Sequence, residues 1–341
     1  MPRSLPLDIL RLLACFMVVL MHSPIPGGGD GGEYGYFLTA LSYFTTPCVP
    51  LFFMVSGALL LRNGSDDVDN VHWLKCRIGK VVIPTIVFSL FYIFVNVNNE
   101  HWFTAILSIP FSTQGHGVLW FMYTLVGLYL ITPIIKPWLK RATKSEVRLY
   151  LIIWGISLLY PYIEGFVAVN RGDTGVLYYL SGYVGYFLLG HYLTRWQVKR
   201  PTIVVLLVLT ALVLPLPLFN KVCGWNLNFY SAFWYLSAPV CVMTMTYFSL
   251  FTYLFRNSNR SYPIITLLSN LAFGVYLVHI FIMRNILWEV DIIKGIENYP
   301  VQTILIFAVT SLLSFIVCYF LSLLPFGHYI IGYKHRVSKS A

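Results

Sequence analysis

Two side chains that can do chemistry, Arg11 and His22, lie in an otherwise apolar run, LDILRLLACFMVVLMHSP, at residues 7–24. A charged side chain at the bilayer centre costs about 2.5–3.5 kcal/mol, so such residues usually face the protein interior or a water-filled cavity. Arg11 and His22 are eleven residues apart. At about 100° per residue they return to nearly the same helix face, about 16 Å apart along the axis. This spacing predicts a cation and an imidazole at the two ends of one elongated ligand.

Other roles for these two residues stay open at this stage. Arg11 is close to the expected cytoplasmic boundary, where its side chain can snorkel to the lipid headgroups, and Asp8 is near enough to pair with it. His22 stands at the end of the run, where a lone histidine is usually a satisfied polar residue. The alternatives to a ligand site are therefore a membrane anchor and a hydrogen-bonded imidazole.

Further candidates lie on the side that we expect to be cytoplasmic. Arg77 and Lys80 are about one helical turn apart, in a segment that we expect to be a cytoplasmic loop. Two cations on one face suit phosphate oxygens, although ordinary loop charge is the alternative. Ser56 and Gly57 are small residues of the second apolar segment and allow close approach of a helix or a ligand.

A second group of candidates lies toward the opposite side. His116 and Trp120 are about one turn apart at the start of an apolar segment, where tryptophan either anchors the interface or offers a stacking face for a sugar. Tyr276 and His279 are three residues apart and share a helix face. His279 falls in an outer half, as His22 does, so it either shares a cavity with His22 or is bonded to a neighbouring carbonyl.

The elements that must position these residues are membrane-spanning helices. The chain has 341 residues, of which 58% are hydrophobic and only 11% are charged. Apolar segments about 17–25 residues long recur along it and are apolar on every side, which excludes a strand-built outer-membrane barrel. We expect an all-α polytopic membrane protein that forms one domain over residues 1–341, with no separate soluble domain. The ten expected spans lie at about 5–24, 36–61, 81–98, 118–135, 148–164, 176–194, 202–219, 230–255, 263–286 and 300–325.

The formal net charge of +10 follows the membrane topology. With a cytoplasmic N-terminus, eighteen of the 23 lysines and arginines fall in cytoplasmic loops and four in the opposite loops, and Arg11 is the remaining one. This asymmetry is the positive-inside rule, and it places both termini in the cytoplasm. The excess of basic over acidic residues therefore indicates membrane lipids, and not nucleic acid, as partners.

Several kinds of catalytic site have no counterpart in the sequence. The histidines lie on separate segments with no H-x-x-x-H pairing, and the cysteines have no C-x-x-C spacing, so we expect no metal site. The sequence contains no G-x-S-x-G elbow, Walker loop or dinucleotide fingerprint.

Four stretches in chain order resemble the acyltransferase family 3 membrane proteins, particularly the branch similar to the O-acetyltransferase of enterobacterial common antigen. The first is the Arg11-x10-His22 signature. The others are VPLFFMVSGALL at 49–60, LWFMYTLVGLYLITPII at 119–135 and LAFGVYLVHI at 271–280. The basic R-x-x-R motif of the family reads Arg77-Ile-Gly-Lys80 here, and a lysine is a poorer two-point partner for phosphate than an arginine.

The resemblance implies an O-acyltransferase of the bacterial inner membrane that uses cytosolic acyl-CoA, most simply acetyl-CoA, as donor substrate without a tightly bound cofactor. Arg11, Arg77 and Lys80 would hold the donor phosphates, and the pantetheine arm would pass Ser56. His22 would act as general base or as nucleophile on the acyl group. The implied acceptor is a hydroxyl of a surface polysaccharide or lipid-linked glycan, bound near four supporting residues, which are Trp120, Tyr276, His279 and His116.

Two rival functions use the same features. A polytopic exporter of glycans or small molecules would also keep polar residues inside its spans, but the hydropathy shows no inverted repeat and no matched pair of broken helices. A ligand-sensing module would normally bring an output domain, and the chain ends in a short basic tail. Transfer of a labelled acyl group by the purified protein separates the enzyme from both rivals.

Overall fold

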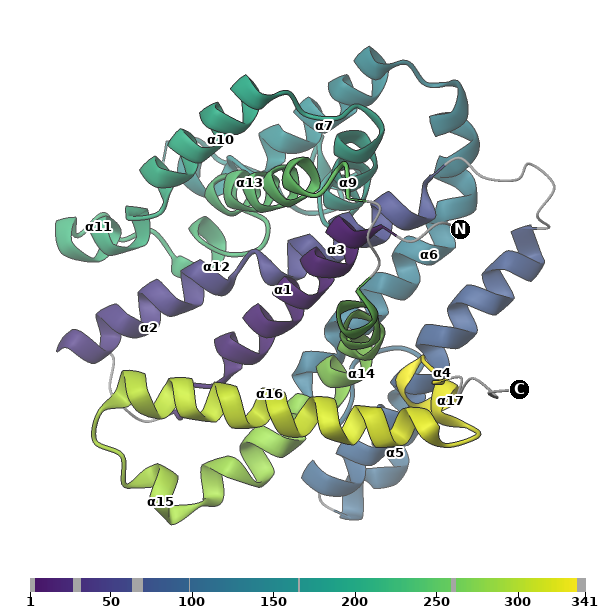
Figure 1. Ribbon diagram of the computed structural model, residues 1–341. Helices are drawn as coiled ribbons and strands as arrows, with labels where there is room; N and C mark the ends of the chain where they lie inside the picture. Colours follow the sequence, from purple (N-terminus) through teal and green to yellow (C-terminus); the bar gives the residue numbers. More distant parts are fainter. Residues whose placement is uncertain are drawn as a thin grey trace.

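The computed structural model describes residues 4–26, 32–62, 70–97, 99–164, 166–258 and 262–335. Every regular element in these ranges is helical, and no strand occurs in them, so the all-α prediction is confirmed. The helices are α1 (Leu5–His22), α2 (Gly32–Thr45), α3 (Cys48–Leu60), α4 (Asn70–Asn96), α5 (Trp102–Ser108), α6 (Trp120–Arg141), α7 (Lys144–Ser157), α8 (Tyr160–Ile163), α9 (Val184–Arg195), α10 (Arg200–Val213), α11 (Leu216–Cys223), α12 (Phe229–Ala232), α13 (Ala238–Leu254), α14 (Pro263–Asn285), α15 (Asp291–Lys294), α16 (Tyr299–Leu323) and α17 (Gly327–Ile331) (Figure 1). Short 3-10 turns are η1 (Asn99–His101), η2 (Gly117–Leu119), η3 (Tyr178–Leu180) and η4 (Leu287–Glu289).

Seven segments of the described chain are long and apolar enough to cross a membrane, so the protein is a multi-pass membrane protein. They are Leu5–His22, Tyr34–Leu60, His72–Asn96, Gly117–Arg141, Arg200–Cys223, Pro263–Glu289 and Tyr299–Leu323. The other three expected spans contain shorter helices, namely α7 with 14 residues, α9 with 12 and α13 with 17. Gly182, whose φ is 80°, lies in the non-helical stretch directly before α9, and Pro239 lies in the first turn of α13. The count of ten spans stays a prediction.

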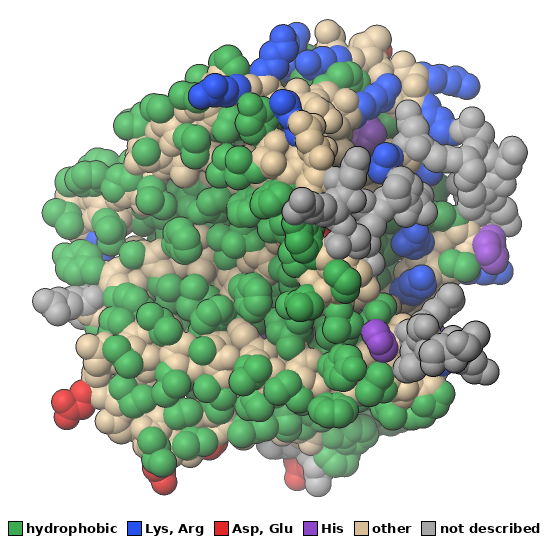
Figure 2. Space-filling view, viewed as in Figure 1, with side chains coloured by type: hydrophobic (Ala, Val, Ile, Leu, Met, Phe, Trp, Pro, Cys, Tyr) green, Lys and Arg blue, Asp and Glu red, His purple; other side chains and the backbone are tan. Residues whose placement is uncertain are grey.

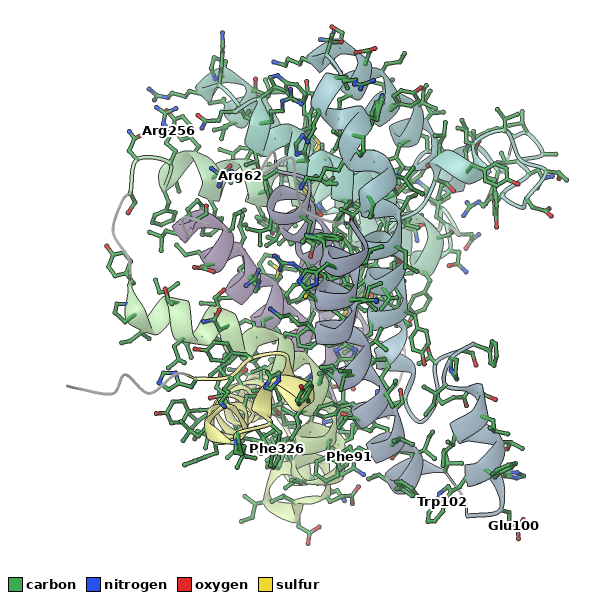
Figure 3. The ribbon with its side chains drawn as sticks, turned by 90° about the vertical axis from the view of Figure 1, so that its right-hand side faces the viewer. Arg62, Phe91, Glu100, Trp102, Arg256 and Phe326 are labelled. Carbon is green, nitrogen blue, oxygen red and sulfur yellow. The ribbon has the colours of Figure 1, made fainter. Side chains whose placement is uncertain are left out.

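Charge is distributed unevenly over the surface. Figure 2 shows Lys and Arg side chains along the upper and right-hand edges, Asp and Glu along the lower edge, and an apolar belt between them. In Figure 3, Arg62 and Arg256 lie at one end of the molecule and Glu100 at the other. The Arg195 Nη1 donates to the Leu139 carbonyl at 2.7 Å, which joins two ends that the predicted topology places on the cytoplasmic side. The pattern agrees with the positive-inside rule, while the side on which the termini lie stays a prediction.

Two glycines allow α3 and α9 to cross in backbone contact. A β-carbon on Gly57 would lie 1.8 Å from the Phe187 carbonyl oxygen, and one on Gly190 would lie 2.0 Å from the Met54 carbonyl oxygen. Small residues at helix crossings let backbones approach in this way. Gly57 therefore serves helix packing, one of the two roles that its small size suggested.

The central helix α1 packs on α3 and runs parallel to α14. Its successive side chains meet successive positions of α14: Arg11 meets Ser269, Cys15 meets the Ala272 carbonyl, and His22 meets His279. Figure 1 shows α1 in the middle of the bundle, between α3 and α14. Because α1 is unbroken from Leu5 to His22, the helical spacing predicted for Arg11 and His22 is present.

Candidate functional site

Two imidazoles meet at the ends of α1 and α14. The ring centroids of His22 and His279 are 5.4 Å apart, with the planes tilted by 59°. The His22 Nδ1 lies 2.8 Å from the Val18 carbonyl oxygen, and the His279 Nδ1 lies 2.7 Å from the Tyr276 carbonyl oxygen. A carbonyl only accepts hydrogen bonds, so Nδ1 carries the proton in each neutral ring and Nε2 holds the free lone pair. The backbone thus sets the tautomer that a base needs.

The His279 ring is fully buried, and its Nε2 has no hydrogen-bond partner among the described residues. Buried polar atoms are nearly always bonded, so an unbonded one in a candidate site needs an explanation. His22 is half-buried. The backbone bond considered as an alternative role for His279 is present, and it leaves Nε2 free for chemistry.

His116 and Arg284 lie beside the histidine pair. The His116 Nε2 is 3.1 Å from the Arg284 Nη1, and its Nδ1 is 3.2 Å from the Val118 amide nitrogen. A neutral imidazole has one acceptor nitrogen, so only one of these donors can be accepted at a time. Burial, followed by the charges of Arg284 and His22, lowers the pKa of His116 to about 4. His116 is therefore neutral at pH 7.

Tyr276 joins α14 to the start of α6. Its hydroxyl donates to the Val118 carbonyl, and its ring centroid lies 5.8 Å from that of His279 and 5.2 Å from that of Phe121. Since the phenol donor is already engaged with the backbone, Tyr276 contributes a ring wall and fixes η2 against α14.

Trp120 belongs to an aromatic wall at the end of α1. Its ring centroid is 5.4 Å from that of Tyr183 and 5.7 Å from that of Tyr235. The Tyr235 hydroxyl donates to the Met21 Sδ at 3.5 Å, directly before His22 in the chain. Trp120 is half-buried in this cluster, so it packs against other rings instead of standing alone as an interface anchor.

The opposite end of α1 holds Arg11. Its Nη1 lies 3.4 Å from the Ser269 Oγ, and the Ser269 hydroxyl donates to the Asp8 Oδ1 at 2.7 Å. Asp8 is buried and Arg11 is half-buried. Arg11 therefore faces α14 and is linked to Asp8 through a serine, an arrangement unlike that of a side chain snorkelling to lipid headgroups.

Arg77 and Lys80 lie within α4 and not in a loop, so that expectation was wrong. No proline occurs between Asn70 and Lys80, and Pro84 lies inside α4 without ending it, so α4 begins at Asn70, well before the expected span. Arg77 is half-buried, and both it and Arg11 are within electrostatic range of the Tyr129 hydroxyl on α6. Lys80 is exposed. The structure therefore brings Arg11 and Arg77 toward one region.

Ser56 lies between these two ends. It is half-buried on α3, one turn after Phe52, whose ring centroid is 5.7 Å from that of Phe121 on α6. Ser56 thus faces α6, the helix that carries Trp120 at its outer start and Tyr129 farther along.

Two cavities in the described part of the chain are lined by residues other than the candidates on α1. One of about 520 Å³ is bounded by the start of α1 and the ends of α3, α9 and α13. The other, of about 290 Å³, is apolar and lies among α4, α5 and α6. Neither is lined by Arg11, Arg77 or His22. A passage that joins the two ends of the candidate site stays a prediction.

Three residues near the histidine pair and in the aromatic wall were not predicted from the sequence: Arg284, Tyr183 and Tyr235. Arg284 carried a signal, because it is one of only four cations on the expected outer side and follows His279 by about one turn. The two tyrosines lie in runs rich in aromatic residues, and nothing in the spacing of those runs distinguishes them.

A model of one protein family, described as an acyltransferase domain, matches residues 6–323 of the chain. The matched range contains every candidate site residue described above. Comparison with curated proteins gave no match, and comparison with solved structures gave none.

Proposed function

Because the chain belongs to the acyltransferase family whose model covers residues 6–323, we propose that it is a membrane O-acyltransferase that moves an acyl group, most simply acetyl, from acyl-CoA to a glycan hydroxyl. The observation that supports this best is the pair of imidazoles with free Nε2 atoms at the end of α1, on the helix that also carries Arg11. Membership of the enterobacterial common antigen branch stays a prediction.

The donor end of the proposal rests on cations near one membrane side. Arg11 and Arg77 both act electrostatically on Tyr129, and Lys80 is exposed one turn farther along α4. Guanidinium groups pair well with phosphate oxygens, and the nucleotide end of acyl-CoA carries several phosphates. An extended pantetheine arm is uncharged and can follow α3 past Ser56. The phosphates and the thioester of the bound donor would then be about 16 Å apart, which is the axial distance from Arg11 to His22.

The reaction needs a base at the thioester. The Nε2 of His22 takes the proton of an acceptor hydroxyl, and the hydroxyl oxygen forms a bond to the thioester carbonyl carbon. The carbon–sulfur bond then breaks, and the proton passes from Nε2 to the leaving sulfur, which departs as the thiol. As a nucleophile, the same Nε2 would attack the thioester and carry the acyl group before passing it on. Both routes require a neutral ring with Nδ1 protonated, which is the tautomer set by the Val18 carbonyl.

The acceptor end is expected at the aromatic wall. Trp120, Tyr183 and Tyr235 form a wall of aromatic rings that contacts Met21, the residue before His22, and rings of this kind stack on sugars. The acceptor that we propose is a surface polysaccharide or lipid-linked glycan, and the location that we propose for this multi-pass protein is a bacterial inner membrane.

The proposal is tested with purified full-length protein and acetyl-CoA labelled in the acetyl group. Transfer of the label to a glycan extract, with release of free CoA thiol, is the expected result. A protein that moves glycan across vesicles but leaves the thioester intact would instead be a transporter.

Arg11→Ala is expected to raise the apparent KM for acyl-CoA by about tenfold or more, since a charge-assisted hydrogen bond contributes about 1.5–3 kcal/mol. Steady-state kinetics at varied acyl-CoA concentration measures the effect. Arg11→Lys keeps the charge and should recover part of the affinity, while loss of the Ser269 contact alone would affect stability and not KM. An unchanged KM in both variants would leave Arg11 a purely structural role.

The rate is expected to fall as the pH drops through the pKa of His22, because protonation of Nε2 removes the lone pair that both routes use. A pH–rate profile with saturating acyl-CoA measures this acidic limb. His116→Gln should leave the position of the limb unchanged, because His116 has a pKa of about 4 and stays neutral above pH 5. If the acidic limb disappears in His116→Gln, the titrating group is His116 and not His22, and the prediction is wrong.

A further inference from the structure

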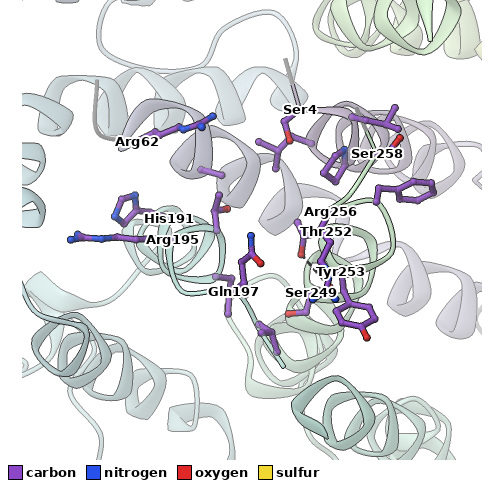
Figure 4. A pocket seen from close by; sticks show the side chains of 18 residues that line it. Ser4, Arg62, His191, Arg195, Gln197, Ser249, Thr252, Tyr253, Arg256 and Ser258 are labelled. Atoms are coloured by element: carbon purple, nitrogen blue, oxygen red, sulfur yellow. Dashed lines mark hydrogen bonds between the residues drawn. The ribbon is translucent and has the colours of Figure 1, made fainter. Parts of the chain in front are cut away.

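The larger cavity, of about 520 Å³, has a strongly basic wall. Figure 4 shows it between the start of α1 and the ends of α3, α9 and α13, with Arg62, Arg195 and Arg256 among its lining side chains. None of the eighteen lining residues is an aspartate or a glutamate. Its volume falls within the range of about 300–1,000 Å³ typical of small-molecule sites. The described lining therefore favours an anionic ligand.

Two buried polar atoms in the same wall lack partners. The His191 Nε2 and the Ser249 Oγ are buried and form no hydrogen bond with any described residue. His191 is on α9 and Ser249 on α13, so the two atoms come from different helices that meet at this cavity. Native proteins leave few such buried polar atoms without a hydrogen bond. A polar ligand that bonds to both atoms would explain why neither has a partner within the protein itself.

The arginines are arranged to hold their planar groups in place. Arg195 donates to the Leu139 carbonyl at 2.7 Å, and its guanidinium carbon lies 4.5 Å from the Trp196 ring centroid. The guanidinium carbon of Arg256 lies 4.6 Å from the ring centroid of Tyr253. Guanidinium forks that are already oriented suit two-point contact with phosphate oxygens better than lysines do.

We propose that this cavity is a second anion site, which binds a phosphate ester between Arg62, Arg195 and Arg256, with polar atoms of the ligand at His191 and Ser249. It is distinct from the region that Arg11 and Arg77 share near Tyr129, because it is bounded by α9 and α13. Leu7 lines the cavity one turn before Arg11, so the two regions are neighbours along α1. The phosphate comes either from a nucleotide, such as the end of a CoA donor, or from a phospholipid headgroup.

Binding is measured without any acyl transfer, on full-length protein in phosphatidylcholine nanodiscs. The first probe is adenosine 3′,5′-bisphosphate, whose binding is measured by isothermal titration calorimetry. The second arm adds phosphatidylglycerol to the nanodiscs and counts the retained anionic lipids by native mass spectrometry. The test variant is Arg62→Gln with Arg256→Gln, because Arg195 also holds the end of α6 and its loss can disturb folding. The matched control is Arg148→Gln, an exposed arginine on α7 outside the cavity.

The double variant is expected to weaken one of the two probes at least tenfold, about 1.4 kcal/mol, while Arg148→Gln binds as the unaltered protein does. Loss of nucleotide binding identifies a nucleotide as the source, and loss of lipid retention alone identifies a headgroup. Equal binding of both probes by the double variant and the unaltered protein would overturn the proposal. His22→Ala should bind the probes normally, so failure of the acyl-transfer proposal and failure of this one are separable.

Discussion

His22→Ala is expected to abolish acyl transfer while the protein still inserts and folds. A positioned base contributes about 10²–10⁴-fold to the rate, and a nucleophile that carries the acyl group is needed for every turnover. His22 is the last residue of α1, and its only recorded hydrogen bond in the described structure is to the Val18 carbonyl within the same helix. Its removal therefore takes away the free Nε2 without breaking a hydrogen bond between helices. Release of CoA thiol by the purified variant measures the loss.

A matched histidine controls for the substitution. His101 is exposed at η1, so His101→Ala should keep full activity. Because the His279 Nε2 is a second free acceptor near His22, His279→Ala in the same assay shows whether it assists or replaces His22. A fully active His22→Ala enzyme would remove His22 from the mechanism.

Gly57→Ala is expected to destabilise the protein severely. The new β-carbon would lie 1.8 Å from the Phe187 carbonyl oxygen, and the obstacle is backbone and cannot rotate away. Overpacking a core usually costs about 1–3 kcal/mol, and separating α3 from α9 should cost at least that much. Thermal unfolding of the detergent-purified protein, together with the yield of monodisperse material, measures the effect.

Gly127→Ala is the control for the same chemical change. Gly127 lies inside α6, and a β-carbon there meets nothing within 4 Å. Alanine is favoured over glycine inside a helix by about 1 kcal/mol, so this variant should be as stable as the original or more so. Equal unfolding temperatures for the Gly57 and Gly127 variants would show that α3 and α9 do not cross in backbone contact.

Helical periodicity accounts for what the sequence could predict of the site. Arg11 and His22 lie on one unbroken helix, so their relation depends on residues within α1 alone. The same is true of Tyr276 and His279 on α14. The proximity of His22 to His279 was offered as one alternative, and it required that α1 and α14 lie side by side in parallel, which the structure now shows.

Features set by contacts between distant segments could not be predicted from the sequence. The meeting of Gly57 with Phe187 and the wall formed by Tyr183 and Tyr235 join parts of the chain that share no local pattern. Arg62 and Arg256 were explained by topology alone, since any cytoplasmic loop attracts such charges. Only their common cavity distinguishes them from other basic loop residues.

We propose that Arg11 binds the donor phosphates at one end of α1 and that the His22 imidazole transfers the acyl group at the other. The decisive measurement is mass spectrometry of surface glycans from three kinds of cell: cells with the unaltered protein, cells with His22→Ala at equal level, and cells with neither. We expect an added mass of one acyl group on a glycan only in the cells that carry the unaltered protein. The same added mass in the His22→Ala cells, or in all three samples, would contradict it.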